Sequence, residues 1–213
     1  MASRTLHLAA AKVISESYDS GDKNRFSLGM LLPDMYVVQK KNRSATHLIK
    51  YYDSGEKTID IAACRALFGD RLTADPLYLG YYLHLVQDLV YHYSLHVVYN
   101  LNSRDRETVN RLHNDYRLIN RYAIDRYKLE NNVLLPENFA GEKLNEMFEL
   151  DVSTLYDELA EDFSSSGEGE TFFFTEKMAD DFVSQSAKLC LNEIDALMNG
   201  KSALDGHKYY WRA

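Results

Sequence analysis

One stretch of the chain decides its fold: DPLYLGYYLHLVQDLVYHYSLHVVYNL, residues Asp75–Leu101. Apolar side chains would cover almost every side of a helix with this sequence, which is typical of a helix buried at the centre of a bundle. Its polar residues are not scattered, since His84 and Asp88 lie one turn apart and about 40° from each other around the helix axis. The stretch therefore predicts a buried central helix that carries a narrow polar stripe.

The remaining sequence predicts further helices around the central one. Periodic apolar residues mark them at Ser3–Tyr18, Thr58–Phe68, Arg104–Leu129, Glu142–Phe163 and Thr175–Met198. Ser3 is placed to cap the first of these helices, and Gly69 to end the second. Pro33 disfavours helical backbone before it and predicts a break near Asp34, and Thr46–Tyr52 is expected to be a short helix or a turn. The pattern predicts an all-α fold, a compact multi-helix bundle.

Length and composition agree with that fold class. The chain has 213 residues, of which 46% are hydrophobic and 26% charged, as is usual for a globular protein with a sizeable core. Only 3 prolines and 10 glycines interrupt it, few for an all-β fold with its many turns. Because no repeat or change of composition marks a boundary, we expect one all-helical domain over residues 1–213.

Charge and segment composition exclude several classes of protein. The net charge is −8, so the surface repels phosphate backbones and stable nucleic-acid binding is not expected. An enzyme that acts on a phosphoester stays possible, because a bound metal reverses the local field. There is no run of 18 apolar residues for a transmembrane segment and no secretory signal. Together with two widely separated cysteines, Cys64 and Cys190, this predicts a cytoplasmic protein.

A buried polar stripe needs partners, and a metal ion would supply them. His92 continues the stripe of His84 and Asp88 by one more turn, and Gln87 lies on its flank. Imidazole nitrogen and carboxylate oxygen are preferred zinc ligands, at about 2.0–2.2 Å from the ion. The alternative is that His84 and Asp88 only hydrogen-bond to each other and to neighbouring tyrosines. His96, further round the helix, is expected to be a half-buried residue at the helix end.

Three more residues of the same kinds stand in apolar surroundings: His7, Asp34 and His47. His7 lies on or beside the apolar face of the first helix, Asp34 follows the apolar run LGMLLP, and His47 lies within SATHLIKYY. Taken alone, each has an ordinary explanation as a structural histidine, a helix cap or a turn residue. Taken together they favour a site shared with the central helix, because His and Asp would otherwise recur in apolar contexts for unrelated reasons.

The order of these residues resembles the zinc-dependent phospholipase C family, a superfamily that also includes the secreted single-strand-specific nucleases. The resemblance covers about residues 1–96 and lies in His7, LGMLLPD ending at Asp34, THL with His47, and GYYLHLVQD with His84 and Asp88. It implies a helix bundle of that family's type, with one zinc ion surrounded by the last four of these residues. Asp88 would bridge to a second ion that His7 also binds. The resemblance also implies that metal-activated water attacks phosphorus, with Asp34 as a candidate base.

The chain departs from the family pattern at two further ligands. Secreted members use a processed amino terminus as a ligand, whereas here Met1 lies six residues before His7. They also carry a later His-x-x-x-Glu pair, but the nearest candidate, His113, has Arg117 at the fourth position after it. His92 could supply the missing imidazole. We therefore expect one zinc site, leave a second open, and find too few ligands for a third.

Two functional hypotheses follow. In the first, the chain is a zinc-dependent hydrolase, a phosphoesterase that uses metal-activated water on a phosphodiester or phosphomonoester of a small molecule or lipid. Its catalytic residue would be Asp34, and its metal ligands His7, Asp34, His47, His84, Asp88 and His92. In the second, the chain is a non-catalytic helical protein with a structural metal or a buried His/Asp cluster. A phosphohydrolase of the adjacent His-Asp class is disfavoured, because the chain contains no His-Asp dipeptide.

Overall fold

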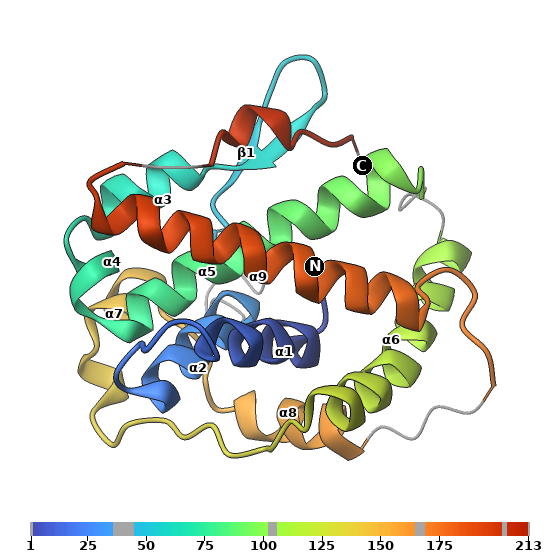
Figure 1. Cartoon of the computed structure of the whole chain (residues 1–213), viewed down its shortest axis with the longest axis horizontal. Coiled ribbons are helices and arrows are strands. Elements are labelled where there is room, and N and C mark those ends of the chain that lie inside the picture. Colours follow the sequence, from blue (N-terminus) through green and yellow to red (C-terminus); the bar gives the residue numbers. More distant parts are fainter. Residues whose placement is uncertain (1, 36–44, 102–105, 165–168, 202–203, 213) are drawn as a thin grey trace.

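Nine α-helices build the fold within the residues that the computed structural model describes, which are 2–35, 45–101, 106–164, 169–201 and 204–212 (Figure 1). In chain order they are α1 (Arg4–Ser15), α2 (Lys23–Leu31), α3 (Ile61–Phe68), α4 (Arg71–Ala74), α5 (Pro76–Tyr93), α6 (Arg106–Tyr127), α7 (Lys143–Phe148), α8 (Leu155–Ser164) and α9 (Glu176–Met198). Short 3-10 turns lie at Leu32–Asp34, Phe139–Gly141 and Gly206–Lys208, and one antiparallel strand pair joins β1 (Ile49–Tyr51) to β2 (Lys57–Ile59). The predicted all-α class is confirmed.

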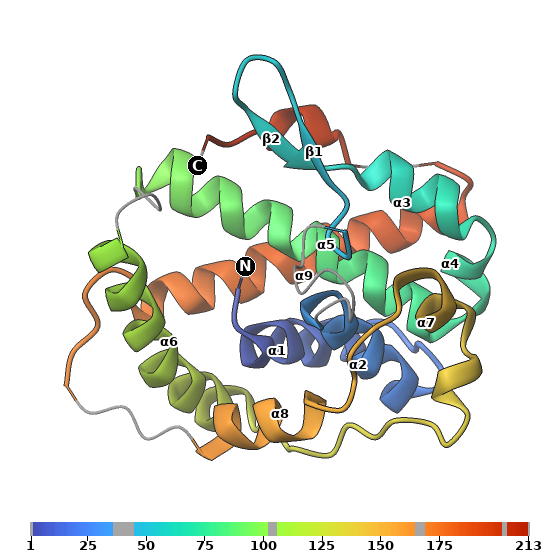
Figure 2. The ribbon, with the colours of Figure 1, turned by 180° about the vertical axis from the view of Figure 1, so that it is seen from behind.

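Helix α5 runs through the middle of the molecule (Figures 1 and 2). All of its residues over the range 77–91 are buried. The helix begins where the Asp75 side chain accepts a hydrogen bond from the Leu77 amide, with Pro76 at the first helical position. Helices α2 and α9 pack along it, and α1 packs in turn against both of them. The prediction of a buried central helix is thereby confirmed for most of its length.

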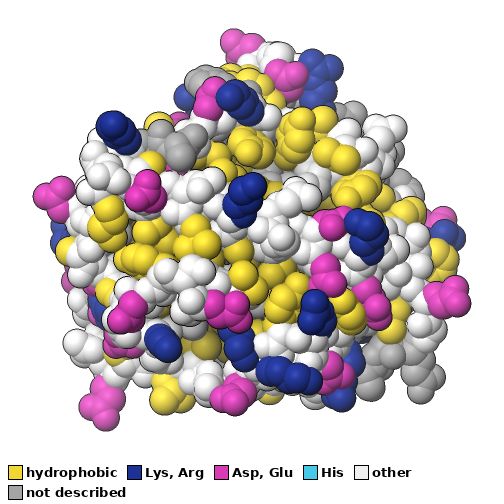
Figure 3. All heavy atoms as spheres, in the orientation of Figure 1, with side chains coloured by type: hydrophobic (Ala, Val, Ile, Leu, Met, Phe, Trp, Pro, Cys, Tyr) yellow, Lys and Arg dark blue, Asp and Glu magenta, His cyan; other side chains and the backbone are white. Residues whose placement is uncertain are grey.

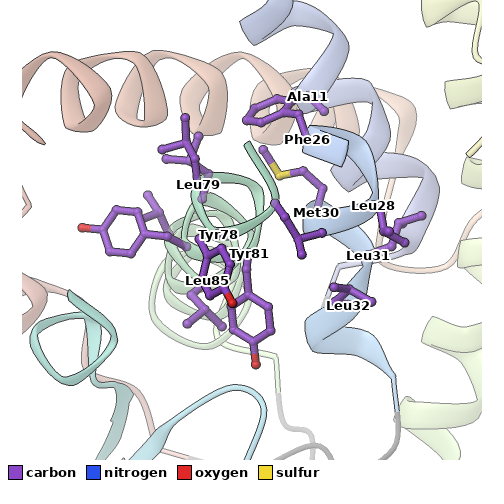
Figure 4. Packing of buried hydrophobic residues seen from close by; sticks show 14 of the residues in the cluster. Ala11, Phe26, Leu28, Met30, Leu31, Leu32, Tyr78, Leu79, Tyr81 and Leu85 are labelled. Carbon is purple, nitrogen blue, oxygen red and sulfur yellow. The ribbon is translucent and has the colours of Figure 1, made fainter. Parts of the chain in front are cut away.

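Two glycines let α2 cross α5 at close range. A Cβ atom on Gly29 would lie 2.2 Å from the Leu77 carbonyl oxygen, and one on Gly80 would lie 2.3 Å from the Phe26 carbonyl oxygen. Figure 4 shows this region along α5, with Met30 of α2 lying between the two helices. The close crossing holds α2, and the 3-10 turn that follows it, against the polar stripe of α5.

The strand pair lies where helix or turn was predicted. Within Thr46–Tyr52, a turn leads into β1, so the prediction of a short helix or turn is wrong for its second half. The helix predicted at Thr58–Phe68 begins only at Ile61, where the Asp60 side chain caps it. The strands form because the turn at Gly55, with φ of +80°, brings β2 back onto β1. Each strand forms only through pairing with the other, so the sequence pattern of either segment alone does not predict it.

Three helix boundaries also differ from the prediction. Ser3 occupies the N-cap position of α1, but its hydroxyl pairs with that of Thr5 at 3.0 Å and does not cap the helix. The helix predicted at Glu142–Phe163 is two helices, α7 and α8, because Glu149 adopts a left-handed conformation with φ of +49° and ends α7. The central helix does not continue to residue 101, since a π-helical turn, Ser94–Val98, follows α5. The apolar pattern of the sequence continues through the π-helical turn, so the pattern alone does not distinguish this turn from a continuing α-helix.

The outer surface is mixed in character. Figure 3 shows Lys and Arg side chains interspersed with Asp and Glu over one face, with hydrophobic side chains between them and no histidine among the coloured residues. None of the helices in the described part of the chain combines the length and hydropathy needed to span a bilayer. Buried apolar side chains form two clusters, one centred on α2 and α5 and the other on α1, α6 and α9. The assignment of residues 1–213 to a single domain stays a prediction.

Candidate metal centre

Five of the predicted ligands, from four parts of the chain, meet beside the polar stripe of α5. His84 and Asp88 lie on α5 itself. Helix α1 supplies His7, the 3-10 turn after α2 supplies Asp34, and the turn before β1 supplies His47. All five residues are buried, with exposed fractions between 0% and 2%. The structure therefore gathers polar side chains that the sequence distributes over its first 88 positions.

The donor atoms of these residues lie at the separations expected of neighbouring ligands. Nε2 of His47 lies 3.2 Å from Nε2 of His84 and 3.2 Å from Oδ2 of Asp88. Oδ1 of Asp88 lies 3.5 Å from Nε2 of His7, and Oδ1 of Asp34 lies 3.7 Å from Nε2 of His47. Adjacent ligands of tetrahedral zinc would be about 3.4 Å apart, given bonds of about 2.1 Å. Two overlapping groups, His7–Asp34–His84 and His47–His84–Asp88, could each hold a metal ion.

Each histidine of the cluster is oriented through its other ring nitrogen, Nδ1. The neighbouring oxygens are Met30 O for His84 at 2.7 Å, Gln87 Oε1 for His7 at 2.8 Å, and Thr46 Oγ1 for His47 at 3.2 Å. A carbonyl oxygen only accepts, so Nδ1 of His84 carries the proton and its Nε2 presents a lone pair. The Thr46 hydroxyl donates to the Pro33 carbonyl at 2.8 Å and therefore accepts from His47. Such outer contacts direct Nε2 inward, as in metal-binding histidines.

The side chains of the cluster hold protons unequally. Burial alone would raise the pKa of Asp88, but the positive charge of the amino terminus and the neighbouring imidazoles of His47, His7 and His84 hold that pKa well below its usual range. Burial, reinforced by the nearby His7, lowers the pKa of His84. Burial also acts to lower the pKa of His7, yet Asp88 and Asp34 outweigh it and the pKa is raised. Asp88 is therefore an anion, and the imidazole of His7 takes up a proton more readily than that of His84.

Among the buried atoms of the cluster, Nε2 of His7 and Oδ2 of Asp88 form no hydrogen bond with any residue that the structure describes. The other oxygen of Asp88 accepts the Ala2 amide at 3.1 Å. A buried polar atom without a partner costs free energy, and a cation would give both of these atoms a ligand bond. The residues present thus fit a divalent metal ion.

His92 lies one turn beyond Asp88 on α5, but it belongs to neither ligand group. Its ring is stacked with two others, with centroids 4.4 Å from the Trp211 ring and 5.8 Å from the His96 ring. Burial holds the pKa of His92 well below its usual range, so the imidazole is neutral. Among the described residues, His96 and His113 also lie outside the two groups. All three histidines line a neighbouring pocket.

This pocket has a volume of about 480 Å³, and Asp34 belongs both to its lining and to a ligand group. The volume falls in the range of small-molecule sites, about 300–1,000 Å³. The lining combines apolar side chains, such as Leu95 and Leu112, with charged ones, such as Arg4 and Asp162. The cluster therefore adjoins a space that could hold an amphipathic small molecule.

Sequence reasoning missed most of the residues that line the pocket. Arg4 donates to Asp162 at 2.7 Å across 158 positions of the chain, so no local pattern connects the two. Trp211 belongs to the aromatic run YYW, and the only signal was that composition, which is more typical of packing. Residues after the central helix could therefore not be assigned to the site from sequence.

Comparisons with protein-family models, with curated proteins and with solved structures find no match for this chain. The interpretation of the site therefore rests on its own residues. These define an all-α protein with a buried His/Asp cluster that could bind a metal ion, next to a pocket of ligand size.

Proposed function

We propose that this chain is a zinc-dependent hydrolase of phosphoesters that acts in the pocket beside the His/Asp cluster. The main support is the position of Asp34, which belongs to a ligand group and also lines the pocket. A metal held by the cluster would meet a substrate on that side. The order of motifs from His7 to Asp88, which resembles the zinc-dependent phospholipase C family, favours the same chemistry and the same type of bundle.

Zinc suits the donor set better than the harder cations. Three imidazole nitrogens and two carboxylates are the ligands that zinc takes in catalytic sites, whereas magnesium and calcium prefer oxygen. When bound, zinc lowers the pKa of water toward about 7 and stabilises negative charge on phosphorus oxygens. A second ion beside the first is proposed because Asp88 offers both of its oxygens, with Oδ2 3.2 Å from Nε2 of His47 and Oδ1 3.5 Å from Nε2 of His7. His84 would bind only one of the two ions, since Nε2 carries its single lone pair.

The protein side chains have separate tasks in this proposal. Among the described residues of the two ligand groups, Asp34 alone lines the pocket, and its carboxylate is the group placed to take a proton from the attacking water. The water oxygen forms a bond to phosphorus, the bond to the leaving oxygen breaks, and that oxygen takes up a proton. Asp88, as an anion among three imidazoles, contributes charge that holds cations.

Metal analysis is the first test. Protein purified without chelators or a histidine tag is expected to contain one or more zinc ions per chain, and His84→Ala, which removes the ligand common to both groups, is expected to lose them. The matched control is His113→Ala, because His113 is exposed and lies outside both groups. If the wild type holds no zinc even after zinc loading, the proposal is wrong at its first step.

Activity tests the second step. Zinc-loaded protein is expected to hydrolyse at least one compound in a panel of small-molecule, nucleotide and lipid phosphomonoesters and phosphodiesters, and chelation is expected to abolish the reaction. Asp34→Asn should lower kcat by about 10²- to 10⁴-fold, the usual contribution of a general base. Asp157→Asn, at an exposed position of α8, should leave it unchanged. A zinc-replete protein that turns over nothing in the panel would refute the hydrolase.

A non-catalytic role is the second candidate, and the burial of the cluster favours it. His7, His84 and Asp88 have no exposed area, as in a structural site whose ligand positions are all filled by protein. In that case Asp34→Ala would lower Tm as much as a core deletion such as Leu83→Ala, and the zinc-loaded protein would hydrolyse no ester. Thermal unfolding of the two variants, with and without zinc, separates the roles.

A further inference from the structure

The segment that follows the Gly206–Lys208 turn brings a tryptophan to the pocket. The Trp211 amide donates to the Lys57 carbonyl at 3.1 Å, and the Lys57 amide donates to the Trp211 carbonyl at 3.0 Å, so the residue bridges to β2. Its ring lies parallel to that of His92, with an interplanar angle of 3°. Trp211 is thus held through both its backbone and its ring in the lining of the pocket.

Three buried polar groups in this lining that form no hydrogen bond with any described residue are Nε1 of Trp211, the hydroxyl of Tyr91 and Nδ1 of His92. Trp211 and Tyr91, the two whose hydrogen is certain, are each 2% exposed. The indole N–H can only donate, and the tyrosine hydroxyl can donate as well. A buried donor without an acceptor costs free energy. The pocket is therefore built for a ligand that presents acceptor atoms.

The charged residues nearby indicate which kind of acceptor the pocket takes. Arg4 forms ion pairs with Asp162 and Glu158, so its charge is compensated within the lining. Lys57 extends over the Trp211 ring, 5.8 Å from its centroid. Arg117, exposed on α6, adds a second positive charge to the lining, which also contains the acidic side chains of Asp34 and Glu161. The cations of Lys57 and Arg117 share the lining with the neutral donors, and this combination favours a ligand with anionic oxygens.

We propose that Tyr91 and Trp211 bind the non-reacting oxygens of a phosphate group and thereby form an anchoring point for substrate that requires no metal. The choice of phosphate as the anion rests on the proposed function. The inference that the pocket binds acceptor atoms rests only on the burial and donor chemistry of the two side chains. The anchoring point holds the phosphate group in the pocket that Asp34 also lines.

Trp211 is the only tryptophan of the chain, so its fluorescence reports on its own surroundings. Inorganic phosphate is titrated into the full chain, once with a chelator and once after zinc loading, with chloride at matched ionic strength as the control. We expect a saturable change of emission with phosphate in both states, and none with chloride.

Calorimetric titration of phosphate into variants tests the two donors. Tyr91→Phe and Trp211→Phe each remove one hydrogen bond to an anion and should weaken phosphate binding by about tenfold or more. Tyr91→Phe keeps the shape of the side chain, so it still tests the proposal if Trp211→Phe fails to fold. Tyr93→Phe is the control, because Tyr93 is on the same helix and does not line the pocket. In the zinc-loaded enzyme the two variants should raise KM for a phosphomonoester by a similar factor.

The outcomes separate this inference from the proposed function. No saturable phosphate binding in either state, or equal affinity in the wild type and both variants, overturns the anchoring point and leaves water as the partner of these donors. Phosphate binding that depends on Tyr91 and Trp211, in a protein that takes up no zinc, keeps the anchoring point and removes the hydrolase. Zinc-dependent hydrolysis with an unchanged KM in both variants keeps the hydrolase and removes the anchoring point.

Discussion

At the scale of single residues, the orientation of the imidazoles decides what the cluster can bind. The side-chain amide of Gln87 contacts both His7 and Met30. Its Oε1 lies 2.8 Å from Nδ1 of His7, and its Nε2 donates to the Met30 sulfur at 3.2 Å. Gln87 is fully buried and lies on the same helix as two ligands. It therefore fixes which nitrogen of His7 faces the proposed ion.

Replacing Gln87 by leucine should weaken zinc binding without removing a ligand. Loss of the acceptor at Nδ1 lets the His7 ring turn and lowers the basicity of its Nε2, so the zinc affinity is expected to fall by about 10- to 100-fold. Competition with a chromophoric chelator measures the Kd. Gln185→Leu, at an exposed position of α9, controls for the change of side chain. An unaltered Kd in Gln87→Leu would mean that His7 does not bind the ion.

The residues of the buried His/Asp cluster could be predicted from the sequence because each is a polar residue in an apolar stretch. His84 and Asp88 are one turn apart on a helix that is otherwise apolar, and Asp34 directly follows an apolar run. The pocket residues carry no such contrast. The backbone of Trp211 bridges to Lys57 and its ring stacks on His92, and the first of these is a pairing across 154 positions that no local pattern encodes.

At the scale of elements, the α2–α5 crossing positions the cluster. Gly29 and Gly80 bring the two backbones together, and this proximity lets the Met30 carbonyl accept from Nδ1 of His84. The glycines lie within the same two motifs as Asp34 and His84. Their physical role in this chain is to allow close approach, since φ is not positive at either position.

Gly80→Ala should destabilise the protein by about 2 kcal/mol or more. Alanine gains about 1 kcal/mol of helix propensity over glycine, but its Cβ would lie 2.3 Å from a backbone oxygen that cannot rotate away, and overpacking of this kind is costly. Denaturant unfolding measures the difference. Gly141→Ala, where no atom lies within 4 Å of the added Cβ, should change stability by less than about 0.5 kcal/mol. Equal stability of the two variants would show that the helices do not cross this closely.

The elements themselves were predicted unevenly, for identifiable reasons. The central helix and α9 follow from periodicity and capping residues, and Thr175 caps α9 through the Met178 amide. Two features had no local signal: the left-handed Glu149 that divides α7 from α8, and the short strands on either side of Gly55. Each depends on a backbone conformation or a partner strand that hydrophobic periodicity does not report.

At the scale of the whole molecule, four buried or half-buried histidines link folding to pH. The pKa values of His84, His92 and His96 are lowered, chiefly by burial, whereas that of His7 is raised by Asp88 and Asp34 against the effect of its burial. Below about pH 6.5 the unfolded chain binds protons at the first three positions that the native protein does not, so the native state loses stability as the pH falls. His7 acts in the opposite sense, because its contribution is present below that pH and is lost as the pH rises.

Three histidines have a lowered pKa and one has a raised pKa, so we predict that the metal-free protein is less stable in mild acid. In the presence of a chelator, Tm should fall between pH 7.5 and pH 5.5, as measured by thermal unfolding at constant ionic strength. Asp88 extends the trend to lower pH, because its depressed pKa contributes stability that begins to be lost in the ordinary carboxyl range and is gone once the pH falls through the depressed pKa. A Tm that rises toward pH 5.5 would show that His7 dominates the titration.

Zinc should make this dependence steeper, because metal and proton compete for the same nitrogens. At pH 7.5 fewer protons compete for the ring nitrogens than in mild acid, so excess zinc is expected to raise Tm through its binding to the native state alone. At pH 5.5 the raised pKa of His7 keeps its ring protonated, and each proton that zinc must displace weakens binding by about tenfold per pH unit. The Tm difference between zinc-loaded and chelated protein should therefore shrink toward zero at pH 5.5. A difference that does not change with pH would mean that the ion binds at carboxylates elsewhere on this acidic chain, and the cluster around α5 would then be a hydrogen-bonded core.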